Sequence, residues 1–142
     1  MALQFRNVDA SPDDDVRTWP YEAVVTAIDR GLVPDWQPLF AEIRRSPWGT
    51  IARRIERYLA YRERDGVGTL FALAIQHSRA GRERADKAEV AARVRAAVAA
   101  SGLTNAQFAE LLGTSASRLS TYLNGHVTPS AALLVRIEHP PV

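Results

Sequence analysis

The stretch of sequence that decides the fold is LTNAQFAELLGTSASRLSTYLNG, residues 103–125. In its first half, Thr104 and Gln107 stand three residues apart, the spacing of a capping box in which each side chain satisfies the other residue's backbone N–H group. Gly113 then ends the pattern, because glycine favours the left-handed conformation found just after a helix. Between them, apolar residues recur at helical spacing, which predicts a short amphipathic helix: Phe108, Ala109 and Leu112.

The second half of the stretch predicts another short helix. Ser115 is a favourable N-cap residue, and Leu119 and Tyr122 lie on one face of a helix over residues 116–124. The turn between the two helices is short, and Ala109 is small enough for the helices to cross closely. These features together predict a helix-turn-helix motif.

Helices are also predicted on both sides of this motif. An Ala-rich helix precedes it and ends at Ser101-Gly102. Pro129-Ser130 opens a last helix, and Pro140-Pro141 ends it because proline cannot continue a helix. We therefore expect a C-terminal lobe of four helices over residues 83–142. Its flanking helices carry the apolar residues Val90, Val94, Ala97, Val98, Leu133, Leu134 and Ile137.

The N-terminal part carries helix signals of its own after an irregular start over residues 1–15. Pro20 and Gly31 bound the first predicted helix, a second begins near Asp35, and Ser46-Pro47 opens a third. Strand signals are nearly absent. The sequence thus predicts an all-α protein, with an N-terminal helical lobe for packing or for a partner followed by the truncated, four-helix lobe.

The boundary between the lobes is placed in a polar segment. Gly66-Val67-Gly68 is expected to break the third helix, and Thr69 to cap a fourth that runs through His77. The polar residues 79–86 then suggest domains 1–82 and 83–142, although a helix that continues through this segment is the alternative.

Composition narrows the functional classes. The chain has no cysteine, which excludes disulfides, thiolate zinc sites and cysteine nucleophiles. No apolar run approaches the ~20 residues of a membrane span, and the acidic start is unlike a signal peptide, so a cytoplasmic protein is expected. Asp13–Asp15 are interpreted as a helix-start signal or a solvated turn, and His77 as a packing residue. We expect no metal, no cofactor and no enzymatic activity.

Charge and aromatic residues each leave two interpretations. Residues 44–64 hold seven Arg against Glu56 and Glu63, a net charge of +5 (7 − 2). This segment is either a solvated helix face, which we favour, or a contact surface for phosphate or an acidic partner. The three tryptophans are interpreted as core residues rather than a platform for stacked bases: Trp19, Trp36 and Trp48.

The outer face of the second motif helix carries the functional prediction. An α-helix fits the DNA major groove, where base edges present a distinguishable code. Short side chains on its outer face allow the helix to lie deep in the groove, close to the bases. Helix N-termini offer free N–H groups to phosphates. The alternative is a purely structural motif. The candidate DNA-binding residues are Thr104, Asn105, Ser115, Ala116, Ser117, Arg118, Ser120, Thr121, Asn124 and His126.

Residues 87–138 resemble the Cro/CI, or XRE, family of DNA-binding domains. The likeness rests on the quoted stretch and on the HVTPS that follows it. It implies that Ala116, Ser117 and Thr121 occupy base-reading positions. It also implies that Asn105 and Asn124 contact phosphates or bases.

Two departures from the family pattern bear on architecture. Family members often pair a Glu just before the Asn-Gly with an Arg on the first helix, and Leu123 and Val98 stand there instead. The family usually has a fifth helix, and we expect none in residues 1–142 after Pro140-Pro141. We therefore expect the apolar edge of Leu133, Leu134 and Ile137 to be covered by the N-terminal helices or by a second subunit in a homodimer.

The N-terminal landmarks give an alternative function. Trp19-Pro20, Arg30-Gly31, Asp35-Trp36 and Pro47-Trp48-Gly49 loosely resemble the front halves of actinobacterial XRE proteins encoded beside toxins. The sequence predicts a sequence-specific, double-stranded DNA-binding regulator, most simply a repressor. The alternative is an antitoxin of a type II toxin–antitoxin pair, which neutralises a toxin through its N-terminal helices and autoregulates its operon.

Overall fold

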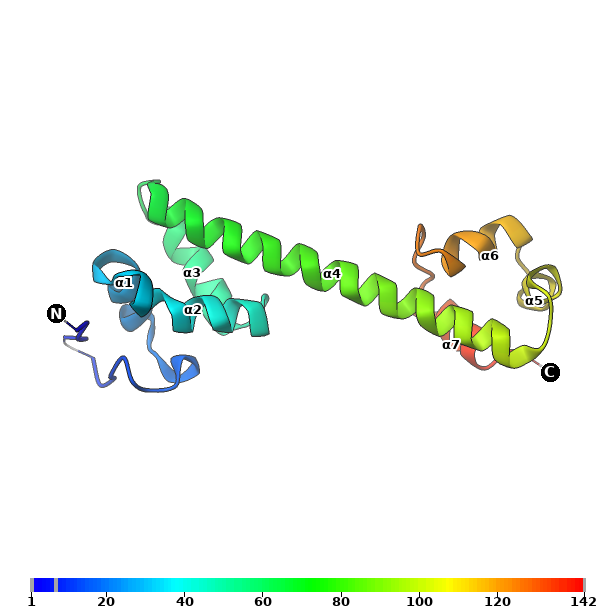
Figure 1. Cartoon of the computed structure of the whole chain (residues 1–142), viewed down its shortest axis with the longest axis horizontal. Coiled ribbons are helices and arrows are strands. Elements are labelled where there is room, and N and C mark those ends of the chain that lie inside the picture. The colour runs from blue at the N-terminus through cyan, green and yellow to red at the C-terminus, as the bar shows by residue number, and fades with distance from the viewer. Residues whose placement is uncertain (1, 7, 142) are drawn as a thin grey trace. The chain divides into compact units, whose positions relative to one another are not determined.

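The computed structural model describes residues 2–6 and 8–141. Every regular element in these ranges is a helix (Figure 1), which confirms the all-α prediction. The chain divides into two compact units, Met1–Arg82 (unit 1) and Glu83–Val142 (unit 2). Helix α4 (Gly66–Ser101) begins in unit 1 and ends in unit 2.

Unit 1 is built from a short 3-10 turn and three complete helices, together with the first part of α4. The turn η1 (Val16–Thr18) is followed by α1 (Tyr21–Arg30), α2 (Val33–Arg45) and α3 (Thr50–Tyr61). These elements enclose one core, in which the largest buried side chains are Trp19, Ile28, Leu39, Ile43, Ile55 and Phe71. Phe40 stacks on Phe71 with ring centroids 4.6 Å apart.

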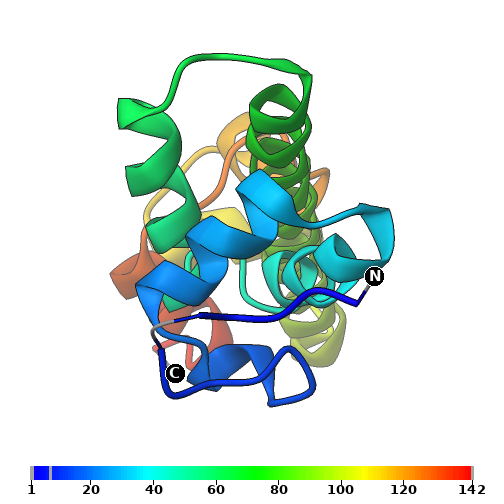
Figure 2. The same ribbon diagram turned by 90° about the vertical axis from the view of Figure 1, so that its left-hand side faces the viewer.

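The N-terminal segment lies along α1, as Figure 2 shows in dark blue. Phe5 meets the ring of Trp19 edge-on at 5.0 Å, and the Trp19 indole N–H donates to the carbonyl oxygen of Asp14. Asp15 caps η1 by accepting the backbone N–H of Arg17. Within the acidic run, Asp15 therefore starts the 3-10 turn, whereas Asp14 accepts the backbone N–H of Ser11 in the turn before it.

One helix of unit 1 begins close to the predicted residue and another begins elsewhere. Helix α2 starts at Val33, and the Asp35 carboxylate accepts the backbone N–H of Leu32, so Asp35 acts within the first turn. Helix α3 starts at Thr50 and not at Ser46-Pro47. The Gly49 N–H donates to the Ser46 carbonyl instead, which makes these residues a turn before the helix.

Helix α4 is continuous, so the alternative left open for residues 79–86 is the correct one. It begins at Gly66, because Asp65 accepts the backbone N–H of Gly68, and the predicted break and the Thr69 cap are wrong. Each of its two parts carries its own buried apolar stripe, and the polar segment between the stripes is the reason that the sequence suggests two helices. The first stripe is Phe71 and Ile75, and the second is Ala91, Val94 and Val98.

Two residues predicted to pack are exposed. Trp19 is buried and Trp36 packs partly against the core of unit 1, as expected, but 46% of Trp48 is exposed. The Arg79 guanidinium lies 6.0 Å from the Trp48 ring, so this indole serves as a surface for a cation. His77 is also exposed, because it projects from the side of α4 opposite Ile75.

Unit 2 consists of the last part of α4 with α5 (Asn105–Leu112), α6 (Ala116–Leu123) and α7 (Ala131–Glu138). Its core contains Ile137, which is 0% exposed, and Leu133 and Leu134 pack against it. The expectation that the N-terminal helices or a second subunit cover these residues is therefore wrong, because they pack within unit 2 itself. Its core is formed by Val94, Val98, Phe108, Ala109, Leu119, Tyr122 and Ile137.

A bidentate ion pair holds α7 against α4 in unit 2. The Arg93 Nε donates to the Glu138 carboxylate at 3.0 Å, and a second bond joins the same two groups. None of the described helices is long and apolar enough to cross a membrane.

Candidate nucleic-acid interface

The start of α5 is fixed by the predicted capping box. The Gln107 backbone N–H donates to Thr104 Oγ1 at 3.2 Å, and the Thr104 N–H donates to Gln107 Oε1 at 2.9 Å. Phe108 and Ala109, which follow, are buried. This arrangement satisfies two N–H groups that a helix start otherwise leaves without a partner.

The turn between α5 and α6 depends on one left-handed residue. Gly113 has φ = 77°, a conformation that suits glycine, and the Thr114 N–H donates to the carbonyl oxygen of Ala109. Ser115 Oγ then accepts the backbone N–H of Arg118 at 3.1 Å and begins α6. The short turn and the buried Ala109 let α6 cross α5 closely.

Helix α6 has one buried and one exposed face. Leu119 and Tyr122 face the core. Ala116, Ser117 and Ser120 are exposed, as predicted for the outer face, whereas Thr121 is half-buried at its edge. All four outer side chains are short, so another molecule can approach the helix backbone.

The comparisons with known proteins agree with this geometry. Residues 89–137 match the family model of a helix-turn-helix domain. The match runs from the second part of α4 to α7 and is consistent with the resemblance to the Cro/CI family. Helix-turn-helix domains are typical of DNA-binding regulators. No curated protein and no solved structure matches the chain.

The hydroxyl groups on the outer face of the helix-turn-helix domain differ in their hydrogen bonds. Thr121 Oγ1 donates to the carbonyl oxygen of Arg118 at 2.6 Å, so its proton is already used and its methyl group is its other outer atom. Ser117 Oγ lies 3.3 Å from Ser115 Oγ. The Ser120 hydroxyl group has no hydrogen-bond partner within the described part of the chain and is free to donate.

The flanking candidates lie at the ends of the same two helices. Thr104 and Asn105 are exposed at the start of α5. Asn124 is the C-cap of α6, and its side-chain oxygen accepts the backbone N–H of His126 at 3.0 Å. Arg118 is exposed, but its Nε donates to the Tyr122 hydroxyl group, so part of its donor capacity serves the domain itself.

Sequence reasoning missed a basic cleft beside the end of α6. We call it the α4–α6 cleft, and it is lined by Arg84, Lys87, Ala88, Ala91, Arg95, Asn124 and Gly125. Arg95 donates to the carbonyl oxygen of Leu123 at 2.7 Å and so ties α4 to the end of α6. The signal was present in the sequence, because the α4 residues of the cleft recur at helical spacing.

The arginines of residues 44–64 belong to unit 1, and several have structural roles. Arg45 pairs with Glu42, and Arg54 donates to the carbonyl oxygen of Trp19. Arg62 pairs with Asp29 and Asp65. The exposed members for which the described residues provide no partner are Arg44, Arg53, Arg57 and Arg64.

Proposed function

We propose that this protein is a sequence-specific, double-stranded DNA-binding regulator that inserts α6 into the major groove. The observation that carries the proposal is the outer face of α6, which is exposed, short and free of charge at Ala116, Ser117 and Ser120. A helix with such a face approaches base edges closely, because no long side chain holds it away. The match to a helix-turn-helix domain supports the same role.

The individual side chains suggest how a site is read. The free Ser120 hydroxyl group is suited to a base or phosphate hydrogen bond. The methyl groups of Ala116 and Thr121 are suited to apolar contact with thymine methyl groups. The exposed N-terminal ends of α5 and α6, at Asn105 and Ser115, are suited to phosphates. A regulator of this kind most simply represses by covering a promoter.

Selection of duplexes from a random-sequence pool by the intact protein tests this proposal. Enrichment of a short motif, with binding that competitor duplexes of other sequence do not displace, is the expected result. A reporter gene behind the motif should be repressed. Recovery of an unenriched pool would contradict sequence-specific binding. An inverted repeat in the motif would indicate that two copies bind.

A second candidate function, that of an antitoxin, is favoured by the surface of unit 1. Leu70 and Leu73 lie one turn apart on α4 and are 45% and 46% exposed, although neither contributes to the helix-turn-helix domain. Exposed apolar side chains of this size are suited to a protein partner. In this case unit 1 binds a toxin while unit 2 controls the operon.

Co-expression with each neighbouring gene of the native host distinguishes the two functions. An antitoxin should relieve growth inhibition by a neighbour, and the double variant Leu70→Ser/Leu73→Ser should lose this relief but keep DNA binding. If no neighbouring gene inhibits growth, the repressor is favoured.

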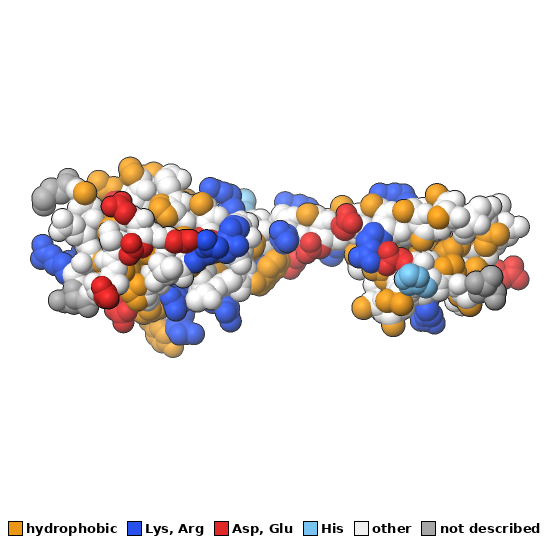
Figure 3. All heavy atoms as spheres, turned by 90° about the horizontal axis from the view of Figure 1, so that it is seen from below, with side chains coloured by type: hydrophobic (Ala, Val, Ile, Leu, Met, Phe, Trp, Pro, Cys, Tyr) orange, Lys and Arg blue, Asp and Glu red, His pale blue; other side chains and the backbone are white. Residues whose placement is uncertain are grey.

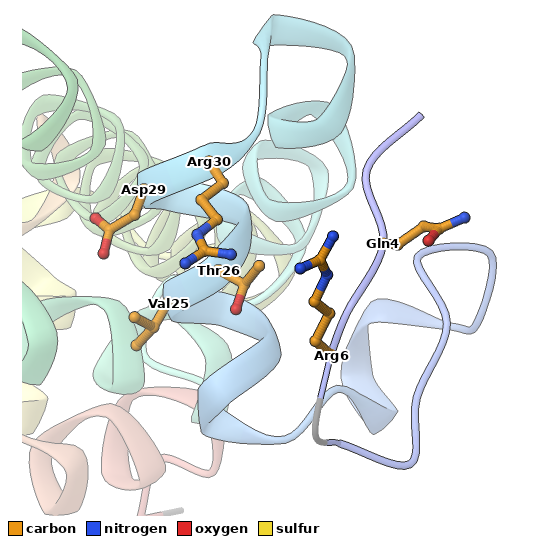
Figure 4. Close-up of a pocket in the computed structure, with 6 residues that line it drawn as sticks. All are labelled: Gln4, Arg6, Val25, Thr26, Asp29 and Arg30. Atoms are coloured by element: carbon orange, nitrogen blue, oxygen red, sulfur yellow. The ribbon is translucent and has the colours of Figure 1, made fainter. Parts of the chain in front are cut away.

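The proposal gives the protein no catalytic role. A polar pocket in unit 1, shown in Figure 4, is lined by Gln4, Arg6, Val25, Thr26, Asp29 and Arg30. Its carboxylate, Asp29, already bonds to Tyr58 and Arg62. Two guanidinium groups beside an occupied carboxylate do not provide a nucleophile and a base.

A further inference from the structure

The α4–α6 cleft lies where α6 ends and not where it begins. Gly125 follows the C-cap of α6, and its φ of +78° turns the chain back toward α4. A Cβ atom built on Gly125 would lie 3.6 Å from the Cβ of Ala91, so the loop rests against a small residue of α4. Together with the bond from Arg95 to the Leu123 carbonyl, this contact fixes the cleft beside α6.

Two cations of the cleft have no structural use. Arg84 and Lys87 are exposed, and neither side chain has a hydrogen bond or an ion pair within the described part of the chain. Glu83, one turn before Lys87, forms no ion pair with it, and Glu89 leaves α4 on the other side, away from the cleft. Both cations are therefore available to an anion from outside.

We propose that Arg84 and Lys87 hold the DNA backbone phosphates beside the end of α6, so that the DNA interface continues beyond the helix-turn-helix domain. The inference rests on the proposed function. Both residues precede residue 89, where the match to the domain begins. The interface is thus extended by the part of α4 that connects the domain to unit 1.

Phosphates are the appropriate partner for chemical and geometric reasons. A groove-bound recognition helix reads bases mainly with its N-terminal residues, so its far end lies nearer to the phosphate-lined walls of the groove. Long cationic side chains neutralise phosphates without reading sequence. Each such contact releases counterions, which adds about 0.9 to the slope of log affinity against log salt.

Salt titration of DNA binding by two charge-matched double variants tests the proposal. Arg84→Ala/Lys87→Ala removes the two cleft cations, and the control Arg53→Ala/Arg57→Ala removes two exposed, unpaired cations of unit 1. The probes are the duplex selected by the intact protein and a scrambled duplex of equal length. Circular dichroism checks that both variants fold.

The cleft variant should have a slope shallower by about 2 than the intact protein. Its affinity for both probes should fall by a similar factor, since phosphate contacts carry no sequence information, and the control should keep the original slope. An unchanged slope for the cleft variant, or an equal change in both variants, would contradict phosphate binding by Arg84 and Lys87. The proposed DNA binding by α6 would still stand. If the intact protein binds no DNA, the proposed function is contradicted, and the role of Arg84 and Lys87 in phosphate binding is contradicted as well.

Discussion

In unit 1 some arginine side chains hold two helices together, whereas in unit 2 two cations beside α6 have no partner among the described residues. Arg79 shows the first use, since it binds Glu56, the Pro47 carbonyl group and the Trp48 ring at once. Arg84 and Lys87 show the second. On the face seen in Figure 3, blue and red side chains lie next to one another over unit 1.

This difference teaches that the number of charges in a segment is a poor guide to its role. Residues 44–64 carry a net charge of +5 (7 − 2), yet Arg45, Arg54 and Arg62 are bound within unit 1. The described residues provide no partner for the other four: Arg44, Arg53, Arg57 and Arg64. The cations that remain free beside α6 are fewer and fall in a segment with nearby acidic residues. Pairing, which depends on the folded structure, decides which charges are available to a partner.

The largest expected effect concerns the separate cores of the two units. Phe71 is fully buried in unit 1 and Phe108 in unit 2, and the two core clusters share no residue. Phe71→Ala should lower the stability of unit 1 by about 3–5 kcal/mol. Hydrogen exchange should accelerate in α1–α3 and stay slow in α5–α7, while Phe108→Ala should give the reverse. Equal acceleration everywhere would show that the units unfold together.

A smaller effect is expected from the structural arginine of unit 1. Arg79→Ala breaks a bidentate ion pair and a hydrogen bond to a backbone carbonyl group, and should lower the free energy of unfolding by about 2 kcal/mol. Arg57→Ala, which removes an exposed and unpaired charge, should change it by less than about 0.5 kcal/mol. Urea unfolding compares the two variants. Similar losses would contradict the division into structural and free arginines.

The same pairs predict how stability depends on acid. The hydrogen bond from Arg79 lowers the pKa of Glu56 below its ordinary 4.5. The pKa of Asp65 is lowered first by the Gly68 backbone N–H and then by Arg62. A lowered folded-state pKa gives stability that is complete above the ordinary pKa and is lost as the pH falls through the folded value.

Thermal unfolding of the intact protein should therefore be constant from about pH 7 to about pH 5 with respect to these groups, and unit 1 should lose stability below about pH 4. Arg79→Ala should make this acid-induced loss smaller, because Glu56 then titrates nearly alike in both states. An acid profile as steep as that of the intact protein would show that the Glu56–Arg79 pair does not contribute.

The parts of the fold that sequence predicted well are those with local causes. The capping box at Thr104, the turn at Gly113 and the cap at Ser115 each depend on residues within one helical turn, and all three are confirmed. The continuity of α4 was left open because its polar middle segment does not itself reveal whether a helix ends there. The Arg79–Glu56 pair depends on a contact between distant residues, which spacing alone does not show. The α4 residues of the cleft do recur at helical spacing, but that spacing does not show that Asn124 and Gly125 lie beside them.

A still smaller effect on stability is expected from two similar helix caps, and only one of these caps lies in the proposed DNA interface. Ser115 Oγ caps α6, and Ser130 Oγ caps α7 by accepting the backbone N–H of Leu133. Ser115→Ala and Ser130→Ala should each lower the free energy of unfolding by about 1 kcal/mol. Only Ser115→Ala should also weaken DNA binding, measured at a temperature where both variants are folded. Equal DNA affinities of the two variants would contradict a contribution of Ser115 to DNA binding.

The central claim, that the outer face of α6 reads DNA, is tested most directly by a gel-shift titration of Thr121→Glu against Ala96→Glu. Both changes add one carboxylate, but Ala96 is exposed on α4 on the side away from the α4–α6 cleft. A carboxylate at position 121 meets phosphates and base edges. The affinity of Thr121→Glu for the selected duplex should fall about a hundredfold or more. The affinity of Ala96→Glu should stay within about twofold of that of the unmodified protein, since screening weakens distant charges. Wild-type affinity of a folded Thr121→Glu protein would contradict the assignment of α6 as the recognition helix.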